Sequence, residues 1–204
     1  MRQEIINIYK FSELSEKAQR RAWDQSPDET YLYDDEFSAT LAAFEKIFDI
    51  DVYRYNVDPF WNPSWSYVKA GKADDCPDGD PLRVARFMWN NYARFISKGK
   101  YYSTPGRWIN GKYTYKFRHS RTTFEMDNCP LTGVCWDLDI LQPIIDCLHY
   151  KRFFNSIDDL YNECLHSFFH SWQAQKDYLQ SFDYFADTCD ANDYEFLETG
   201  EMWK

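Results

Sequence analysis

Apolar residues recur at helical spacing along much of the chain. Phe37, Leu41, Phe44 and Phe48 stand at i, i+4, i+7 and i+11, which predicts a helix over 29–48 with one buried stripe. The same spacing predicts helices over 83–97, 137–154 and 178–189, and a long helix that begins after Ser156. A first helix, with Ser12 or Ser15 as its N-cap, should run to about residue 25. Pro143 is expected in the first turn of its helix or at a kink.

Shorter segments alternate apolar and polar residues and predict strands. These are 5–9, 51–56, 66–70 and 112–118, the last pairing with 122–126 through a turn at 119–120. A terminal hairpin over 194–197 and 201–203 should turn at Thr199-Gly200. Residues 72–81 and 101–110 have irregular, turn-rich compositions, and prolines interrupt the chain at 59 and 63. With no repeat and no linker, we expect one α+β domain over 1–204, with several amphipathic helices packed on a small antiparallel sheet.

Composition limits the class of protein. The chain has 204 residues, of which 20% are aromatic, and disordered chains are poor in aromatic residues. No apolar run approaches the roughly 20 residues that cross a bilayer, and the start MRQEIINIYK lacks the apolar core of a signal peptide. We therefore expect a folded cytoplasmic protein that does not associate with membranes.

Charge is distributed unevenly along the chain. The formal net charge is −10, yet residues 81–124 contain ten Lys or Arg and no Asp or Glu. The rest of the chain carries 13 basic and 33 acidic residues. This asymmetry predicts two surfaces of opposite potential.

The basic segment 81–124 also contains many aromatic residues. Proteins that bind single-stranded nucleic acid combine cations, which follow the phosphates, with rings that stack on bases. The candidates for nucleic-acid contact are Arg107, Lys112, Lys116, Arg118 and Arg121. Alternatively, the aromatic residues fill a core and the cations pair with the protein's own acidic surface.

Two acidic groups are candidates for binding a partner protein. Carboxylates at spacings similar to those of phosphates can occupy the nucleic-acid channel of another protein. These residues are Asp34, Asp35 and Glu36, which precede the apolar stripe of the second helix, and Asp183, Asp187, Asp190, Asp193 and Glu195 near the C-terminus. The alternative is an ordinary solvated face.

Motifs for catalysis or cofactor binding are lacking. The chain has no GxSxG, Walker A, GxGxxG, HExxH or CxxC pattern, so we expect no cofactor and no enzymatic activity. His166 and His170 stand at i, i+4, and two Cys-x-His patterns occur, one at Cys147 and His149 and one at Cys164 and His166, which leaves a metal site open. Most cysteines are interpreted as buried structural thiols.

Three blocks of sequence resemble a family of phage proteins. These blocks are YKFSELSEKAQRRAWDQ (9–25), RHSRTTFEMD (118–127) and DYLQSFDYFADTCDANDYEFLETGEMW (177–203). They are similar, in order and spacing, to a widespread, largely uncharacterised family of phage and prophage accessory proteins, sometimes labelled antitoxin-like. Where that family has a Gly-rich stretch, this chain has FWNPSWSYV (60–68). The resemblance implies an accessory gene of a phage or mobile element and supplies no catalytic residues.

Together these features predict a binding protein. The leading hypothesis is a non-enzymatic inhibitor of a host nucleic-acid-handling defence protein or ribonucleoprotein complex, similar to an anti-CRISPR protein, which acts through its acidic surface. The alternative is a regulator that binds DNA or RNA directly through 81–124, and a metal-dependent enzyme is a third hypothesis. The sequence specifies neither the target nor the oligomeric state.

Overall fold

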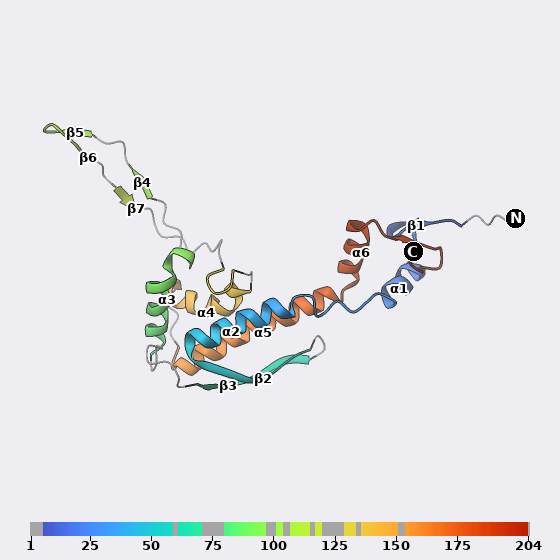
Figure 1. The fold of residues 1–204 in the computed structure, drawn as a ribbon, viewed down its shortest axis with the longest axis horizontal. Coiled ribbons are helices and arrows are strands. Elements are labelled where there is room, and N and C mark those ends of the chain that lie inside the picture. The colour runs from blue at the N-terminus through green and yellow to red at the C-terminus, as the bar shows by residue number, and fades with distance from the viewer. Residues whose placement is uncertain are drawn as a thin grey trace. The chain divides into compact units, whose positions relative to one another are not determined.

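The computed structural model describes residues 6–58, 61–70, 80–96, 101–103, 107–114, 117–119, 129–133, 136–150 and 154–203 (Figure 1). The helices in these ranges are α1 (Glu16–Asp24), α2 (Asp34–Phe48), α3 (Pro81–Ile96), α4 (Asp137–Tyr150), α5 (Ile157–Leu179) and α6 (Phe182–Ala191), with a short 3-10 helix η1 (Phe11–Glu13). The strands are β1 (Tyr9–Lys10), β2 (Ile50–Asp58), β3 (Trp61–Lys69), β4 (Tyr101–Ser103), β5 (Arg107–Ile109), β6 (Lys112–Thr114), β7 (Phe117–His119) and β8 (Glu195–Phe196).

The fold belongs to the α+β class, as predicted. The described strands form four separate two-stranded sheets, β1–β8, β2–β3, β4–β7 and β5–β6. Because a two-stranded sheet has little area to bury, the helices supply most of the core.

The chain divides into two compact units. Unit 1 consists of Met1–Asp34, Asp58–Asn62 and Trp172–Lys204, and unit 2 of Asp35–Val57 and Pro63–Ser171. The prediction of a single domain over 1–204 stays a prediction.

The core of unit 2 is formed by the stripes of α2 and α5 that the sequence predicted. Phe37 of α2 packs against Phe168 of α5 with ring centroids 5.6 Å apart, and Phe48 packs against Tyr161 at 5.6 Å. Figure 1 shows α2 lying alongside α5. Helices α3 and α4 pack against each other and add buried aliphatic residues, among them Val84, Met88, Ile140, Leu141 and Ile144.

A buried carboxylate organises the entry to α4 within unit 2. Asp137 is fully buried and accepts hydrogen bonds from the backbone N–H groups of Leu131 (2.8 Å) and Thr132 (2.7 Å). It also accepts hydrogen bonds from the hydroxyls of Thr132 (2.6 Å) and Thr40 (3.0 Å). A carboxylate in the first turn of a helix is favoured by the helix dipole, and these donors replace the water that the charge loses on burial.

Unit 1 brings together segments from the two ends of the chain. Strand β1 pairs antiparallel with β8, Tyr9 opposite Phe196 and Lys10 opposite Glu195. The core beneath them contains Phe11, Leu14, Ala18, Ala22, Phe185, Cys189 and Phe196. Phe11 lies at the centre of an aromatic cluster, 5.3 Å from Phe185 and 5.8 Å from Phe196.

Most predicted helices and caps are confirmed. The side chain of Ser15 accepts a hydrogen bond from the N–H of Ala18 and caps α1, and Ser156 accepts one from Asp159 (3.0 Å) at the start of α5. The terminal hairpin is also confirmed, because Phe196 pairs with Met202 and the N–H of Gly200 donates to the carbonyl of Leu197 (2.9 Å).

Two helix starts were predicted too early. The structure places α2 from Asp34 instead of residue 29, because Asp28 accepts hydrogen bonds from the N–H and hydroxyl of Thr30 and holds this stretch in a turn. Helix α6 begins at Phe182 instead of 178, since the hydroxyl of Ser181 caps it and α5 extends to Leu179. Pro143 lies in the second turn of α4, which contradicts the first of its two predicted positions, while the predicted kink stays a prediction.

The predicted strands were also partly wrong. Strand β1 is limited to Tyr9–Lys10, and Pro63 lies inside β3, which a two-stranded sheet tolerates because one side of each strand is an edge. Residues 101–110, predicted to be irregular, contain β4 and β5. Of the strand predicted over 112–118, residues 115–116 lie outside the described part of the chain, and the residues on either side of them form β6 and β7. These pair with β5 and β4, whereas the expected partner, 122–126, lies outside the described residues, as does most of the predicted loop 72–81.

Within the part of the chain that the structure describes, no helix combines the length and the apolar character of a membrane span.

Candidate functional site

Three acidic residues form an exposed stripe on α6. Asp183, Asp187 and Asp190 follow each other at i, i+4 and i+7, and all three are exposed. The opposite face of α6 carries Phe185 and Cys189, which are buried in the core of unit 1. The helix therefore directs its carboxylates to solvent because its apolar residues face inward. Among the described residues, none forms an ion pair with these three carboxylates. We call them the α6 acidic face.

The two other predicted C-terminal acids are engaged by a lysine. Lys10 of β1 lies 2.9 Å from the carboxylate of Asp193 and 3.4 Å from that of Glu195, its cross-strand neighbour. The hydrogen bond to Asp193 raises the pKa of Lys10 above its usual value, so the ammonium group of Lys10 stays protonated at neutral pH. Asp193 and Glu195 remain exposed, but part of their charge is neutralised within the protein.

Asp34 forms an ion pair within unit 1, and its assignment to a partner-binding surface stays a prediction. Its carboxylate lies 2.6 Å from the ammonium of Lys176 and accepts a hydrogen bond from the indole of Trp172 (2.8 Å). Lys176 is largely buried and also donates to the carbonyl of Thr30 (2.9 Å). Asp35 is exposed and Glu36 half-buried, and both belong to unit 2.

The two units differ in charge. Unit 1 contains 7 Lys or Arg and 16 Asp or Glu, a formal charge of −9. Unit 2 contains 16 Lys or Arg and 17 Asp or Glu, which gives it a formal charge of −1. Nearly all of the net negative charge of the protein therefore belongs to the unit that carries the α6 acidic face.

The basic segment contributes an exposed hairpin, β5–β6. Asn110 and Gly111 connect the strands with positive φ values of 49° and 75°, as a type I′ turn requires. Trp108 and Tyr113 face each other across the strands, with ring centroids 5.5 Å apart, and Trp108 is 72% exposed. Lys112 is exposed one residue from Tyr113. These side chains form what we call the aromatic hairpin.

The other predicted cations are described only in part. Arg107 occupies the β5 position opposite Thr114, and Arg118 the β7 position opposite Tyr102. Lys116 and Arg121 lie outside the described residues.

The cysteine and histidine candidates do not assemble into one site. His166 and His170 lie side by side on α5, with ring centroids 4.2 Å apart, whereas His149 stacks on Tyr150. Burial raises the pKa of Cys164 well above its usual value, and the nearby Cys147 adds to this effect. Such a thiol stays protonated and is a poor metal ligand or nucleophile. Within the described residues, no three His, Cys, Asp or Glu side chains could hold a metal together.

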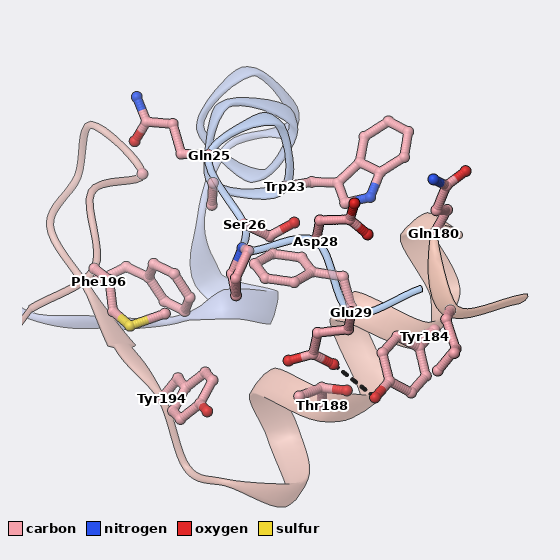
Figure 2. Close-up of a pocket in the computed structure, with 16 residues that line it drawn as sticks. Trp23, Gln25, Ser26, Asp28, Glu29, Gln180, Tyr184, Thr188, Tyr194 and Phe196 are labelled. Carbon is pink, nitrogen blue, oxygen red and sulfur yellow. Dashed lines mark hydrogen bonds between the residues drawn. The ribbon is translucent and has the colours of Figure 1, made fainter. Parts of the chain in front are cut away.

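A pocket of about 720 Å³ in unit 1 was missed by sequence reasoning (Figure 2). It opens between the C-terminal end of α1, the turn at 26–29 and helix α6. Aromatic side chains form much of its wall, including Trp23, Tyr184, Phe185, Tyr194 and Phe196. Its two charged residues are Asp28, which the sequence placed before the second helix, and Glu29, which it placed at the start of that helix. No sequence signal marked them, because the wall comes from both ends of the chain.

Comparison with known proteins gives no further assignment. No family model, curated protein or solved structure matches the chain. The resemblance to phage accessory proteins therefore stays a prediction.

Proposed function

We propose that the protein is a non-enzymatic binding protein whose α6 acidic face docks on a basic, nucleic-acid-binding surface of a partner protein. The observation that carries this proposal is that three exposed carboxylates share one face of α6 and have no cationic partner among the described residues. A carboxylate that is already paired within the protein gains little interaction energy from a second cation. These three carboxylates have no such partner among the described residues, so a cation of another protein can pair with them.

The geometry of α6 suits such docking. At about 1.5 Å of rise per residue, Asp183 and Asp190 are separated by about 10 Å along the helix axis. A row of carboxylates on this scale can meet a row of Lys and Arg side chains that otherwise contacts phosphates. The formal charge of −9 on unit 1 would also accelerate encounter with a basic partner.

In its most specific form, the proposal is a phage-encoded, anti-CRISPR-like inhibitor of a host defence protein or ribonucleoprotein complex. The support for this form is the sequence resemblance to phage accessory proteins together with the acidic surface. The target surface would be the one that normally holds nucleic acid, so the protein and nucleic acid would compete for it.

A pull-down from host lysate tests the proposal. The tagged full-length protein is incubated with lysate, with and without nuclease, and its partners are identified by mass spectrometry. A stoichiometric protein partner should survive nuclease and dissociate in high salt, because screening weakens exposed ion pairs. If all captured proteins are lost after nuclease, the proposal is wrong.

Substitutions locate the surface. The triple variant Asp183→Asn, Asp187→Asn, Asp190→Asn should weaken partner binding at least about tenfold, or roughly 1.4 kcal/mol. The control is Glu16→Gln, Asp24→Asn, Asp51→Asn, which removes the same charge from exposed positions elsewhere. Equal losses in both variants would show a general effect of net charge and would contradict docking through α6.

The aromatic hairpin favours a second function, direct binding of DNA or RNA. A tryptophan 72% exposed beside a tyrosine and a lysine can stack on an unpaired base. Reversing the charge at Lys112, Lys116, Arg118 and Arg121 should then abolish oligonucleotide binding, and Trp108→Ala should weaken it by about 1–3 kcal/mol. Unchanged binding in fluorescence anisotropy would exclude this function.

A further inference from the structure

The pocket in unit 1 has a negative electrostatic environment. Of the described residues that line it, none is Lys, Arg or His, whereas Asp28 and Glu29 both contribute carboxylates. The C-terminal ends of α1 and α5 also border it, through Trp23 and Gln25 and through Leu179 and Gln180. The C-terminus of a helix carries a partial negative charge and attracts cations.

The opposite field, from the N-terminus of α6, is reduced locally. Tyr184 and Phe185 in the first turns of α6 reach the pocket wall. The hydroxyl of Ser181 accepts a hydrogen bond from the N–H of Tyr184 (3.1 Å), and Asp183 lies in the same turn. A capped N-terminus with an acidic residue offers little positive potential to a ligand.

Glu29 is the carboxylate best placed to meet a ligand. Figure 2 shows its side chain beside Tyr184, and its Oε2 accepts a hydrogen bond from the hydroxyl of Tyr184 (2.8 Å). The other oxygen, Oε1, has no hydrogen-bond or ion-pair partner among the described residues. Asp28 already accepts two hydrogen bonds from Thr30 on its Oδ1, at 3.0 and 2.7 Å, and its charge is partly offset by Lys176, which makes it the weaker of the two candidates.

The aromatic walls are held in place before a ligand arrives. Phe185 and Phe196 belong to the buried core of unit 1, and Trp23 and Tyr194 pack against that core. Trp23 also contacts Phe182 edge to face at 5.8 Å. Ordered rings around a carboxylate match the usual site of an alkylated cation, because ring faces attract positive charge and also cover methylene groups.

We propose that this pocket binds an organic cation, an alkylammonium or alkylguanidinium group, with the charged head at Glu29 and the stem against the aromatic wall. The volume of about 720 Å³ lies within the range of ligand pockets and exceeds what a lone ion needs. A hard metal ion would require six or more oxygen ligands, which the two carboxylates of Asp28 and Glu29 do not provide. An anion would be repelled by both acids.

The cation can come from two sources, a free small molecule or a Lys or Arg side chain of a partner protein. The second source would connect the pocket to docking by the acidic unit. The inference itself does not rest on the proposed function, because binding of a small cation requires no partner.

Titration of the full-length, ¹⁵N-labelled protein tests the proposal. The probes share a four-carbon stem and differ in the head group: butylguanidinium, butylammonium, butanol and butyrate. We expect both cations to shift the indole signal of Trp23 and the side-chain amide signals of Gln25 and Gln180, with at least tenfold tighter binding than butanol or butyrate. Equal affinity for the cations and butanol would overturn the proposal.

Two variants and a control assign the binding to Glu29. Glu29→Gln keeps the shape and can still accept from Tyr184, so it should weaken cation binding at least fivefold without changing butanol binding. Tyr184→Phe retains the ring and releases Oε2, so cation binding should be unchanged or tighter. Glu16→Gln removes the same charge at an exposed position outside the pocket and should have no effect. Unchanged affinity in Glu29→Gln, with the folded spectrum retained, would contradict the site.

An acetylated and amidated Gly-Arg-Gly peptide distinguishes the two sources. If the peptide binds at least threefold tighter than butylguanidinium, the pocket recognises a protein side chain. If the free cation binds equally well or tighter, the ligand is a small molecule. Should the pull-down yield no partner while the cations still bind, the docking proposal fails and the pocket proposal stands.

Discussion

The two units of the protein use charge in different ways. Unit 2 has almost balanced charge and, among its described residues, buries one carboxylate, Asp137, whose donors come from the loop just before it and from Thr40 of α2. Unit 1 has a formal charge of −9. Its ion pairs join segments far apart in the sequence, Lys10 with Glu195 and Arg21 with Glu201 (2.7 Å). Even after these pairs, the α6 acidic face has no cationic partner among the described residues.

This difference indicates that stability and partner binding depend on different charged residues of the protein. In unit 2, a charge contributes to stability because it is fully hydrogen-bonded in the interior. In unit 1, exposed pairs contribute little each, since water and salt screen them, and the surplus acid is available to another molecule. Substitutions of buried charges should therefore change folding, and substitutions of exposed acids should change binding.

The largest effect is expected at Asp137. Asp137→Ala would leave the N–H groups of Leu131 and Thr132 and the hydroxyl of Thr40 without their acceptor, and should lower the free energy of unfolding by about 3–5 kcal/mol. Urea denaturation followed by circular dichroism measures the change. Asp146→Ala, on the same helix but bonded only to Gln142, should cost less than about 1 kcal/mol. A similar small loss at Asp137 would contradict its role.

A substitution at Gly200 tests how closely the terminal hairpin packs on α1 in unit 1. Its φ is +86°, and an added Cβ would lie 2.2 Å from the carbonyl oxygen of Ala18. Gly200→Ala should therefore cost about 2–4 kcal/mol, from backbone strain plus the clash. Gly133→Ala is the matched control, since its φ is +87° with no atom within 4 Å, and it should cost only about 1–2 kcal/mol. Equal losses in thermal or urea unfolding would show that the close approach is unimportant.

Substitutions of Lys176 and Asp34 test whether an ion pair of unit 1 contributes to the stability of the fold. Lys176→Met should lower the free energy of unfolding by about 1–2 kcal/mol, because Asp34 and the Thr30 carbonyl lose their donor while Asp34 is still partly screened by solvent. A double-mutant cycle with Asp34→Asn should show coupling. Asp34→Asn should leave partner affinity unchanged. A loss of affinity as large as in the α6 triple variant would assign Asp34 to the docking surface.

The smallest effect is a gain in stability at Asp139. Burial raises the pKa of Asp139, partly opposed by the hydrogen bond from the hydroxyl of Ser171 (2.9 Å). A carboxyl whose pKa is higher in the folded than in the unfolded protein destabilises the fold once the pH rises above the unfolded value. Asp139→Asn should thus stabilise the protein by less than about 1 kcal/mol at pH 7, and the gain should shrink toward pH 4.

Urea titrations at several pH values measure this dependence. Asp146→Asn makes the same charge change on the same helix. A gain at Asp139 that does not vary with pH, or that Asp146→Asn reproduces, would exclude burial of the charge as its cause.

Local sequence predicted the helices well because each buries one face. The stripe of Phe37, Leu41, Phe44 and Phe48 specified α2, and Ser15 and Ser156 marked helix starts through hydrogen bonds that need only nearby residues. The terminal hairpin was predictable for the same reason, since Thr199-Gly200 has the turn residues and the flanking strands alternate.

The candidate sites were predicted less completely. Charge counting located the acids of α6, because an exposed helix face needs no tertiary partner. It could not separate Asp34, held by Lys176 from 142 positions away, from acids that remain unpaired. It also missed the pocket, where Glu29 and Tyr184 meet across a sequence separation of 155.

The sequence by itself therefore determined the α+β class, the amphipathic helices and the excess of acid, because periodicity, capping and net charge are properties of neighbouring residues or of their sum. Only the tertiary structure decided which charges are paired, which strands pair and where a cavity opens. Each of these depends on contacts between segments far apart in the chain, and a local pattern contains no information about which distant segment will supply the partner.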